Sequence, residues 1–426
     1  MTSAVFLVAS IVSIAFLLLM LGLAMFERGL PYTITKRPSV ALGSEDFLRI
    51  LASLVGAEVH RGLRIEVLTD GEVYYEGELL AIGAARHSVN LEAYIFEKGE
   101  VTRRFLAALV ERARAGVKVN MVLDAVGSFA TGNDYFAELK RAGGRVCWYH
   151  PIRVQTLPRI NNRTHREIIV VDGRVGFVGG AGFGDRWRFA QGGRARWRDT
   201  MFRVEGDIVR SLQAVFVENW VESSGEILTG EDYFPAGERL GKSIALVAHS
   251  SPTTGLSTRA RMLFQTLLAC ARKSIFVTTP YFVPDKSIRG EMVRAVEERG
   301  VKVHILVPGQ HSDQHLTRRS SRRLYGDLLR VGAEVFEYSP SMMHAKTLVI
   351  DELWSVIGSA NFDNRSFGLN DEVSMAVRDP LLAGRLLEDF ARDVRNSRPI
   401  SYLEWRRRPL LERAHEQLGS LLERQQ

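Results

Sequence analysis

Two histidines stand at matching places in a phrase that the chain contains twice. His165 opens the first copy, residues 165–172, and His344 opens the second, residues 344–351. A strand-like run and a small-residue turn follow each copy, and matching positions are offset by 179 residues throughout. In a duplicated fold, such residues can face each other across an internal two-fold axis. The pair would then suit phosphoryl transfer, in which one imidazole attacks phosphorus and the other protonates the leaving oxygen.

The second copy carries further phosphate-binding groups beside its histidine. Residues two apart in a strand share a face, so His344 and Lys346 are expected to contact the same phosphate. The turn after the next strand contains Ser359 and Asn361, and the matching turn of the first copy contains Gly180. Small residues there let the backbone approach a ligand, and an asparagine amide can donate to a phosphoryl oxygen. We therefore expect Lys346 to be catalytic, and Asn361, Ser359 and Gly180 to bind phosphate.

Four acidic residues accompany these motifs. A nucleophilic histidine needs its other ring nitrogen held. Glu372 is the candidate partner for His344 and Asp199 the candidate for His165, because the acids begin corresponding strands; the alternative is that both are solvated surface acids. The aspartates that end the duplicated phrases are expected to be structural, since strand parity turns them away from the histidines and an Asp-Gly pair favours a hairpin turn. These two are Asp172 and Asp351.

The first copy departs from the second at two positions. Glu167 stands where Lys346 stands in the second copy, and Gly182 stands where Asn361 stands. A carboxylate about 4 Å from a phosphate oxygen costs roughly 4 kcal/mol at an effective dielectric near 20, which is about a thousandfold in rate. Three arrangements would avoid this repulsion: Glu167 is protonated, is turned away, or pairs with an arginine such as Arg163.

The elements needed to position these residues form two similar halves. Strands are expected at 64–68, 88–94, 118–123, 145–149 and 200–205, and in the second half at 243–248, 274–279, 302–307 and 334–338. Helical patterns alternate with them, which predicts α/β domains, each a mixed sheet flanked by helices. We place the domains at 60–222 and 243–400, with 223–242 as the linker. The two halves are expected to pack face to face around a pseudo-two-fold axis, with the histidines at the seam.

The N-terminal segment predicts a membrane anchor. Residues 1–26 contain no charged side chain, and 4–26 are almost wholly apolar, which is long enough to span a bilayer as a helix. A cleaved signal peptide and a buried core helix are the alternatives. Arg28, Lys36 and Arg37 follow the segment, so the positive-inside rule favours a single-pass protein of the cell membrane with its catalytic part in the cytoplasm.

Composition limits the partners. The 426 residues carry a net charge of +7, which favours an anionic partner such as a lipid surface or nucleic acid. Basic and aromatic residues interleave at 186–188 and 194–198. They could lie at lipid headgroups, stack nucleic-acid bases, or form a solvated loop whose tryptophan packs on the domain. The two cysteines lack the spacing of a metal site, and we expect neither metal nor cofactor.

The duplicated pattern resembles the phospholipase D superfamily, and most of all its bacterial cardiolipin synthase branch. The family signature is His-x-Lys-x4-Asp followed by Gly-Gly/Ser-x-Asn. Segments that share the resemblance lie at 91–96, 124–128, 161–165, 279–285 and 358–366. The resemblance implies two duplicated phospholipase D-like domains and a metal-independent, two-step reaction through a phosphohistidine. It also suggests His165 as nucleophile, His344 as acid, and a second lipid alcohol as acceptor.

These expectations lead to one functional hypothesis and two alternatives. The leading hypothesis is a membrane-anchored transferase that moves a phosphatidyl group between phosphatidylglycerol molecules to form cardiolipin. Its partners would be anionic phospholipid and the membrane, without nucleic acid; the oligomeric state stays open. The first alternative is hydrolysis at the same site, as a phospholipase D or a nuclease. The second is a weakly active or inactive homologue, because Glu167 replaces the first lysine.

From the sequence alone we expect Glu167→Lys to raise turnover, because it replaces a repelling carboxylate with an attracting ammonium. The measurement is the rate of purified protein with anionic phospholipid. An unchanged or lower rate would count against the repulsion argument.

Overall fold

A computed structural model describes residues 6–7, 10–17, 32–153, 156, 159, 161–252, 258–409, 412–413 and 416. Of the predicted anchor at 4–26, it therefore covers residues 6–7 and 10–17, which are helical and exposed. The rest of that segment lies outside the described residues. Among the residues described, the helices are all too short or too polar to cross a bilayer.

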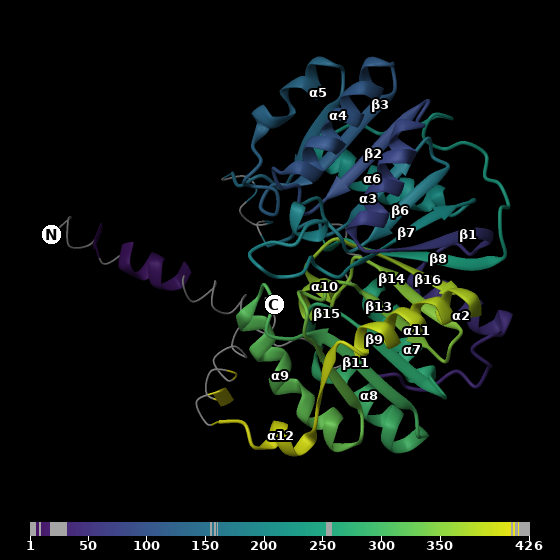
Figure 1. Cartoon of the computed structure of the whole chain (residues 1–426), viewed down its shortest axis with the longest axis vertical. Helices are drawn as coiled ribbons and strands as arrows, with labels where there is room; N and C mark the ends of the chain where they lie inside the picture. Colours follow the sequence, from purple (N-terminus) through teal and green to yellow (C-terminus); the bar gives the residue numbers. More distant parts are fainter. Residues whose placement is uncertain are drawn as a thin grey trace.

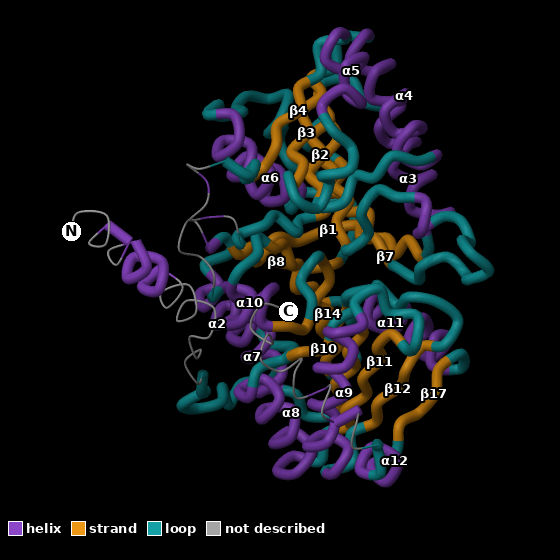
Figure 2. The backbone as a smooth tube through the Cα atoms, turned by 90° about the vertical axis from the view of Figure 1, so that its left-hand side faces the viewer, coloured by secondary structure: helices purple, strands orange, loops and turns teal. Residues whose placement is uncertain are grey.

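Fifteen strands form one continuous mixed sheet that runs through both halves of the chain (Figures 1 and 2). The first half contributes β1 (His60–Thr69), β2 (Ser88–Ala93), β3 (Lys118–Asp124), β4 (Arg145–Tyr149), β5 (Glu167–Val171), β6 (Val175–Gly179) and β7 (Thr200–Glu205). The second half contributes β8 (Ser243–Ser250), β9 (Ser274–Thr278), β11 (Lys302–Pro308), β12 (Glu334–Tyr338), β13 (Thr347–Ile350), β14 (Trp354–Gly358), β16 (Glu372–Arg378) and β17 (Ser397–Ile400). A separate parallel pair joins β10 (Phe282–Val283) to β15 (Phe362–Asp363).

The strand order shows the duplication directly. From the middle outward, the first half runs β1-β7-β6-β5-β2-β3-β4 and the second runs β8-β16-β14-β13-β9-β11-β12. Strands β1 and β8 pair antiparallel at the centre. The halves therefore join edge to edge through their sheets, and the expected face-to-face packing is wrong. Pairing β1 with β8 satisfies the backbone groups of two edges that would otherwise be exposed.

Helices cover both halves of the sheet, as the alternating pattern predicts. They are α2 (Glu45–Val55), α3 (Gly71–Gly83), α4 (Glu100–Arg114), α5 (Ala137–Arg141), α6 (Val209–Ser224), α7 (Arg259–Cys270), α8 (Lys286–Arg299), α9 (His315–Arg330), α10 (Asn364–Gly368), α11 (Pro380–Val394) and α12 (Tyr402–Arg406). Ser44 caps α2 by accepting from the Phe47 N–H. Helix α2 precedes the first half in sequence but packs into the core of the second half.

Apolar side chains from both halves also share one core at the centre of the molecule. Ile168 and Phe202 of the first half belong to the same buried cluster as Val349 and Met375 of the second. Each half has a further core of its own. Because the central cluster takes side chains from both halves, burial of apolar surface holds them in one fixed arrangement.

Asp172 and Asp351 fix equivalent turns in the two halves. The Asp351 carboxylate accepts three backbone N–H bonds at the start of β9, from Arg272 (2.9 Å), Lys273 (2.7 Å) and Ser274 (2.9 Å). Asp172 makes the matching bonds at the start of β2. Both aspartates have positive φ, 52° and 53°, which asparagine and aspartate tolerate better than most residues. These contacts support a structural role for both.

We expect Asp351→Ala to lower the free energy of unfolding by about 3 kcal/mol, because a charged acceptor of three N–H bonds is lost and alanine disfavours positive φ. Chemical denaturation measures the change. Asp351→Asn is the matched control and should lose less, since its amide oxygen still accepts. A loss below about 1 kcal/mol in the alanine variant would contradict this role.

Candidate active site at the junction of the two halves

Two short backbone bridges bring the predicted site residues together at the junction. The chain before β5 pairs with the chain before β16, where the His165 N–H donates to the Asp371 carbonyl (2.9 Å). The chain before β13 pairs with the chain before β7, where the His344 N–H donates to the Arg198 carbonyl (2.7 Å). Each histidine of one half is thus tied to the acid-bearing segment of the other half.

His165 contacts a buried carboxylate of the second half. Its Nδ1 lies 3.1 and 3.2 Å from the two carboxylate oxygens of Glu372. The Ser359 and Ser366 hydroxyls donate to the same carboxylate, at 2.5 and 2.7 Å. Burial alone would raise the pKa of Glu372, but His165 and these donors hold it below its usual value. The ionised form of Glu372 is therefore favoured, and it lies in hydrogen-bond contact with His165 Nδ1.

His344 contacts a buried carboxylate of the first half. Its Nδ1 lies 2.6 Å from Asp199 Oδ2, which also accepts from the indole N–H of Trp187 at 3.0 Å. The Thr200 backbone N–H donates to the other oxygen at 2.8 Å. Burial raises the pKa of Asp199, yet His344 and the Lys346 ammonium outweigh burial and keep it low. The Asp199 carboxylate therefore stays ionised next to Nδ1 of His344.

The expected partners are thus exchanged between the histidines. Glu372 was expected beside His344 and Asp199 beside His165, whereas each acid contacts the histidine of the opposite half. The physical reason is the edge-to-edge junction, because its bridges place each acid segment against the other half's histidine segment. Neither acid is a solvated surface residue, since both are fully buried.

Lys346 lies beside His344, as predicted from strand parity. The hydrogen bonds of Ser359 and of the Asn361 N–H lie instead on the Glu372 side of the site. Lys346 Nζ lies 3.1 and 3.4 Å from the two ring nitrogens of His344, and it donates to the carbonyl of Gly180 at 3.3 Å. Burial first, and then the ammonium of Lys346, lowers the pKa of His344. The Asn361 N–H donates to Ser366, and its side-chain oxygen is buried with no partner in the described part of the chain. Ser359 supports Glu372, so its hydroxyl is already engaged, although it was expected to bind phosphate.

Glu167 lies in the first half at the place equivalent to Lys346. It is 3% exposed, and its Oε1 accepts from the Tyr94 N–H at 3.1 Å. Arg163 instead donates to the His150 carbonyl and lies 3.5 Å from Asp124. Burial raises the pKa of Glu167 well above its usual value. Of the three arrangements that would avoid repulsion of the phosphate, these observations favour protonation of Glu167 over pairing with Arg163.

Aromatic rings around the histidines were not identified from the sequence. The Tyr94 ring packs edge-on against His165 at 5.3 Å, and Trp187 and Trp197 lie 5.5 and 5.3 Å from His344. Trp187 is completely buried. The signal was the interleaved basic and aromatic run, for which the sequence left three roles open, and the burial of Trp187 agrees with the role in which tryptophan packs on the domain. Among the arginines of this run, Arg186 is paired with Glu97 and Arg188 with Glu76 within the fold.

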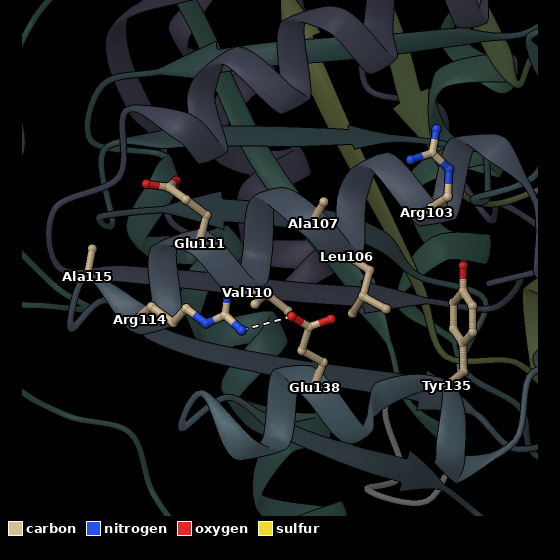
Figure 3. Close-up of a pocket in the computed structure, with 9 residues that line it drawn as sticks. All are labelled: Arg103, Leu106, Ala107, Val110, Glu111, Arg114, Ala115, Tyr135 and Glu138. Carbon is tan, nitrogen blue, oxygen red and sulfur yellow. Dashed lines mark hydrogen bonds and ion pairs between the residues drawn. The ribbon is translucent and has the colours of Figure 1, made fainter.

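A large surface hollow lies away from the histidines. This hollow lies beside α4 and α5, and its lining residues are drawn in Figure 3. Its volume is about 570 Å³, and Arg114 and Glu138 form an ion pair of 2.8 Å across it. The residues that line it include none of the duplicated motif. Geometry at the junction, rather than the size of this hollow, therefore identifies the candidate site.

Comparison with known proteins agrees with this geometry. The family described as "Cardiolipin synthase, PLD-like domain" matches residues 79–220 and 264–394, which is more than half of the chain. A cardiolipin synthase of Geobacillus kaustophilus is 32% identical over 400 residues, covering 93% of this chain and 79% of its own length. Another, from Alkalihalophilus pseudofirmus, is 34% identical over 361 residues, covering 84% and 71%. The crystal structure of a Haemophilus influenzae phosphatidylserine synthase shares the fold, with a TM-score of 0.68 at 14% identity, covering 90% of this chain and all of that one.

The exchanged pairing predicts which acid controls the charge of His344. The Asp199 carboxylate favours the imidazolium, so Asp199→Asn should lower the pKa of His344 further. NMR titration of labelled histidine measures the shift. Glu372→Gln is the matched control and should leave the His344 titration in place. The exchanged assignment would be wrong if the control moved that titration and Asp199→Asn did not.

Proposed function

Because this chain belongs to the cardiolipin synthase family with phospholipase D-like domains, whose members are phosphatidyltransferases, we propose that it joins two phosphatidylglycerol molecules. One molecule donates its phosphatidyl group and the other accepts it, which forms cardiolipin and releases glycerol. The observation that carries the proposal is the pair of imidazoles at the junction, each held at Nδ1 by a buried carboxylate.

In the first step His165 attacks phosphorus. Its Nδ1 faces Glu372, so Nε2 carries the lone pair that forms the new phosphorus–nitrogen bond. The bond from phosphorus to the headgroup glycerol oxygen breaks, and that oxygen takes a proton from His344. We assign the nucleophile to His165 on the family resemblance and on exposure, since its side chain is 13% exposed and that of His344 is 6%.

In the second step the roles of His344 reverse. Now neutral, it accepts the proton from a hydroxyl of the second phosphatidylglycerol, whose oxygen attacks the phosphohistidine. The phosphorus–nitrogen bond breaks, and His165 and His344 return to their starting states. The buried Asp199 carboxylate stabilises the imidazolium form of His344 that each cycle regenerates.

Charge at the phosphoryl group is balanced from the second half. The Lys346 ammonium beside His344 can bind a phosphoryl oxygen, and the amide of Asn361 can donate to another. When the anionic substrate arrives, its charge offsets the effect of Lys346 on His344 and favours the protonated acid. No part of this scheme requires a metal ion.

We further propose that the apolar segment 4–26 anchors the enzyme in the cell membrane. Positive charges at Arg28, Lys36 and Arg37 favour a cytoplasmic catalytic part. An anchor of this kind would hold the active site close to the bilayer that contains its lipid substrate. The substrate would then need to move only a short distance out of the bilayer.

The test is product analysis with phosphatidylglycerol vesicles and the full chain. We expect cardiolipin and glycerol, and a loss of at least about 10³-fold in both His165→Ala and His344→Ala. Formation of phosphatidic acid instead of cardiolipin would show that the site catalyses hydrolysis rather than transfer. A labelled phosphatidyl group should remain bound to His344→Ala after denaturation and be absent from His165→Ala; the reverse result would exchange the two roles.

A further inference from the structure

The two departures of the first half from the duplicated pattern lie next to each other. A side-chain carbon added at Gly182 would stand 3.3 Å from Glu167 Oε1 and 2.8 Å from Ile95 Cβ. A side chain at this position would therefore be crowded first by Ile95, and Glu167 narrows the space further. Gly182 and Glu167 are thus neighbours in space as well as departures from the same motif.

Glu167 is held on one oxygen and open on the other. Oε1 accepts from the backbone N–H of Tyr94 at 3.1 Å, and the backbone N–H of Ile95 also favours the ionised carboxylate. Oε2 is buried and has no partner in the part of the chain that the structure describes. An ionised carboxylate with a desolvated, unpaired oxygen is strongly disfavoured. A protonated carboxyl group at this place would carry an O–H donor without an acceptor. Tyr94 also packs its ring on His165, so the carboxyl is anchored to the residue that covers the proposed nucleophile.

The groups that face Glu167 come from several elements. They are Lys346 before β13, Asp199 before β7, Tyr75 on α3 and the Tyr94 side chain after β2. Lys346 favours the ionised carboxylate and Asp199 disfavours it. The Lys346 ammonium is already engaged with the Gly180 and His344 carbonyls. Burial is the largest effect, and it raises the pKa of Glu167.

We propose that Glu167 is a further catalytic residue, which keeps its proton and donates a hydrogen bond from Oε2 to a phosphoryl oxygen. The proton stays on Glu167 throughout, and no bond of the carboxyl group is made or broken. This role rests on the proposed phosphatidyl transfer at the junction. Lys346 then supplies one cationic donor and Glu167 one neutral donor. A site with two lysines would carry one more positive charge than this site does. The smaller positive charge suits the single negative charge of a phosphodiester.

Kinetics of three variants test the donor. Glu167→Met removes both donor and acceptor, and should lower kcat/KM by about 10²–10³-fold. Glu167→Gln keeps an oxygen for the backbone N–H groups and an N–H donor at the place of Oε2, so it should lose less than about tenfold. Glu167→Lys should be slower than the wild type, because two buried N–H groups lose their acceptor and two ammonium groups meet. Glu297→Gln, on the exposed face of α8, is the unchanged control.

The opposite results would overturn the proposal. A faster Glu167→Lys variant would restore the repulsion argument made from the sequence. A Glu167→Gln variant as slow as Glu167→Met would show that shape and backbone contacts, rather than a neutral donor, are what the site needs.

Infrared spectroscopy tests the proton without turnover. The difference between wild type and Glu167→Gln at neutral pH should show the C=O band of a protonated carboxyl, since the buried Glu78 and Glu92 cancel. Saturating sodium tungstate, a phosphate mimic, should shift that band to lower frequency as the O–H begins to donate. A missing band, or no shift at saturation, overturns the proposal. If the band shifts but phosphatidylglycerol is not converted, the proposed function fails and the neutral donor stands.

Discussion

The exchanged contacts between imidazole and carboxylate are the constraint on which the site depends. Glu372 and Asp199 are both fully buried, and a buried carboxylate is tolerated only when it is paired and hydrogen-bonded. Their partners come from opposite halves of the chain, together with hydroxyl, indole and backbone donors. The same contacts that neutralise the buried carboxylates also fix the orientations of the two imidazole rings. The stability of the junction and the geometry of the site therefore depend on the same contacts.

The junction itself is built from backbone rather than from side chains alone. Strands β1 and β8 continue the sheet from one half to the other, and two single bridges beside the site bring each histidine segment to its acid segment. Apolar side chains of both halves fill a common core around this region. Relative motion of the halves would break ladder hydrogen bonds and expose that core, so the two imidazoles are held at a fixed relative position.

Much of this arrangement could be predicted from local sequence. The repeated phrase drew attention to His165 and His344, which both lie at the junction, and the strand period placed Lys346 beside His344. The pairing of acids with histidines was predicted in reverse, because it depends on how two sheet edges meet, and no local pattern encodes that. The sequence allowed a tryptophan of the 186–198 run to pack on the domain, but it did not predict the hydrogen bond from Trp187 to Asp199, which likewise depends on the folded chain.

The exchange of partners has a consequence for the history of the chain. A single half would carry an imidazole without its carboxylate and an open edge at β1 or β8. Two copies of one such half, paired antiparallel along that edge, would supply each other's missing acid by two-fold symmetry, as isologous dimers do. The duplicated chain therefore has the form of an ancestral homodimer whose subunits became joined. Once two such halves are joined in one chain, each can change independently of the other, as Glu167 and Gly182 in one half and Lys346 and Asn361 in the other illustrate.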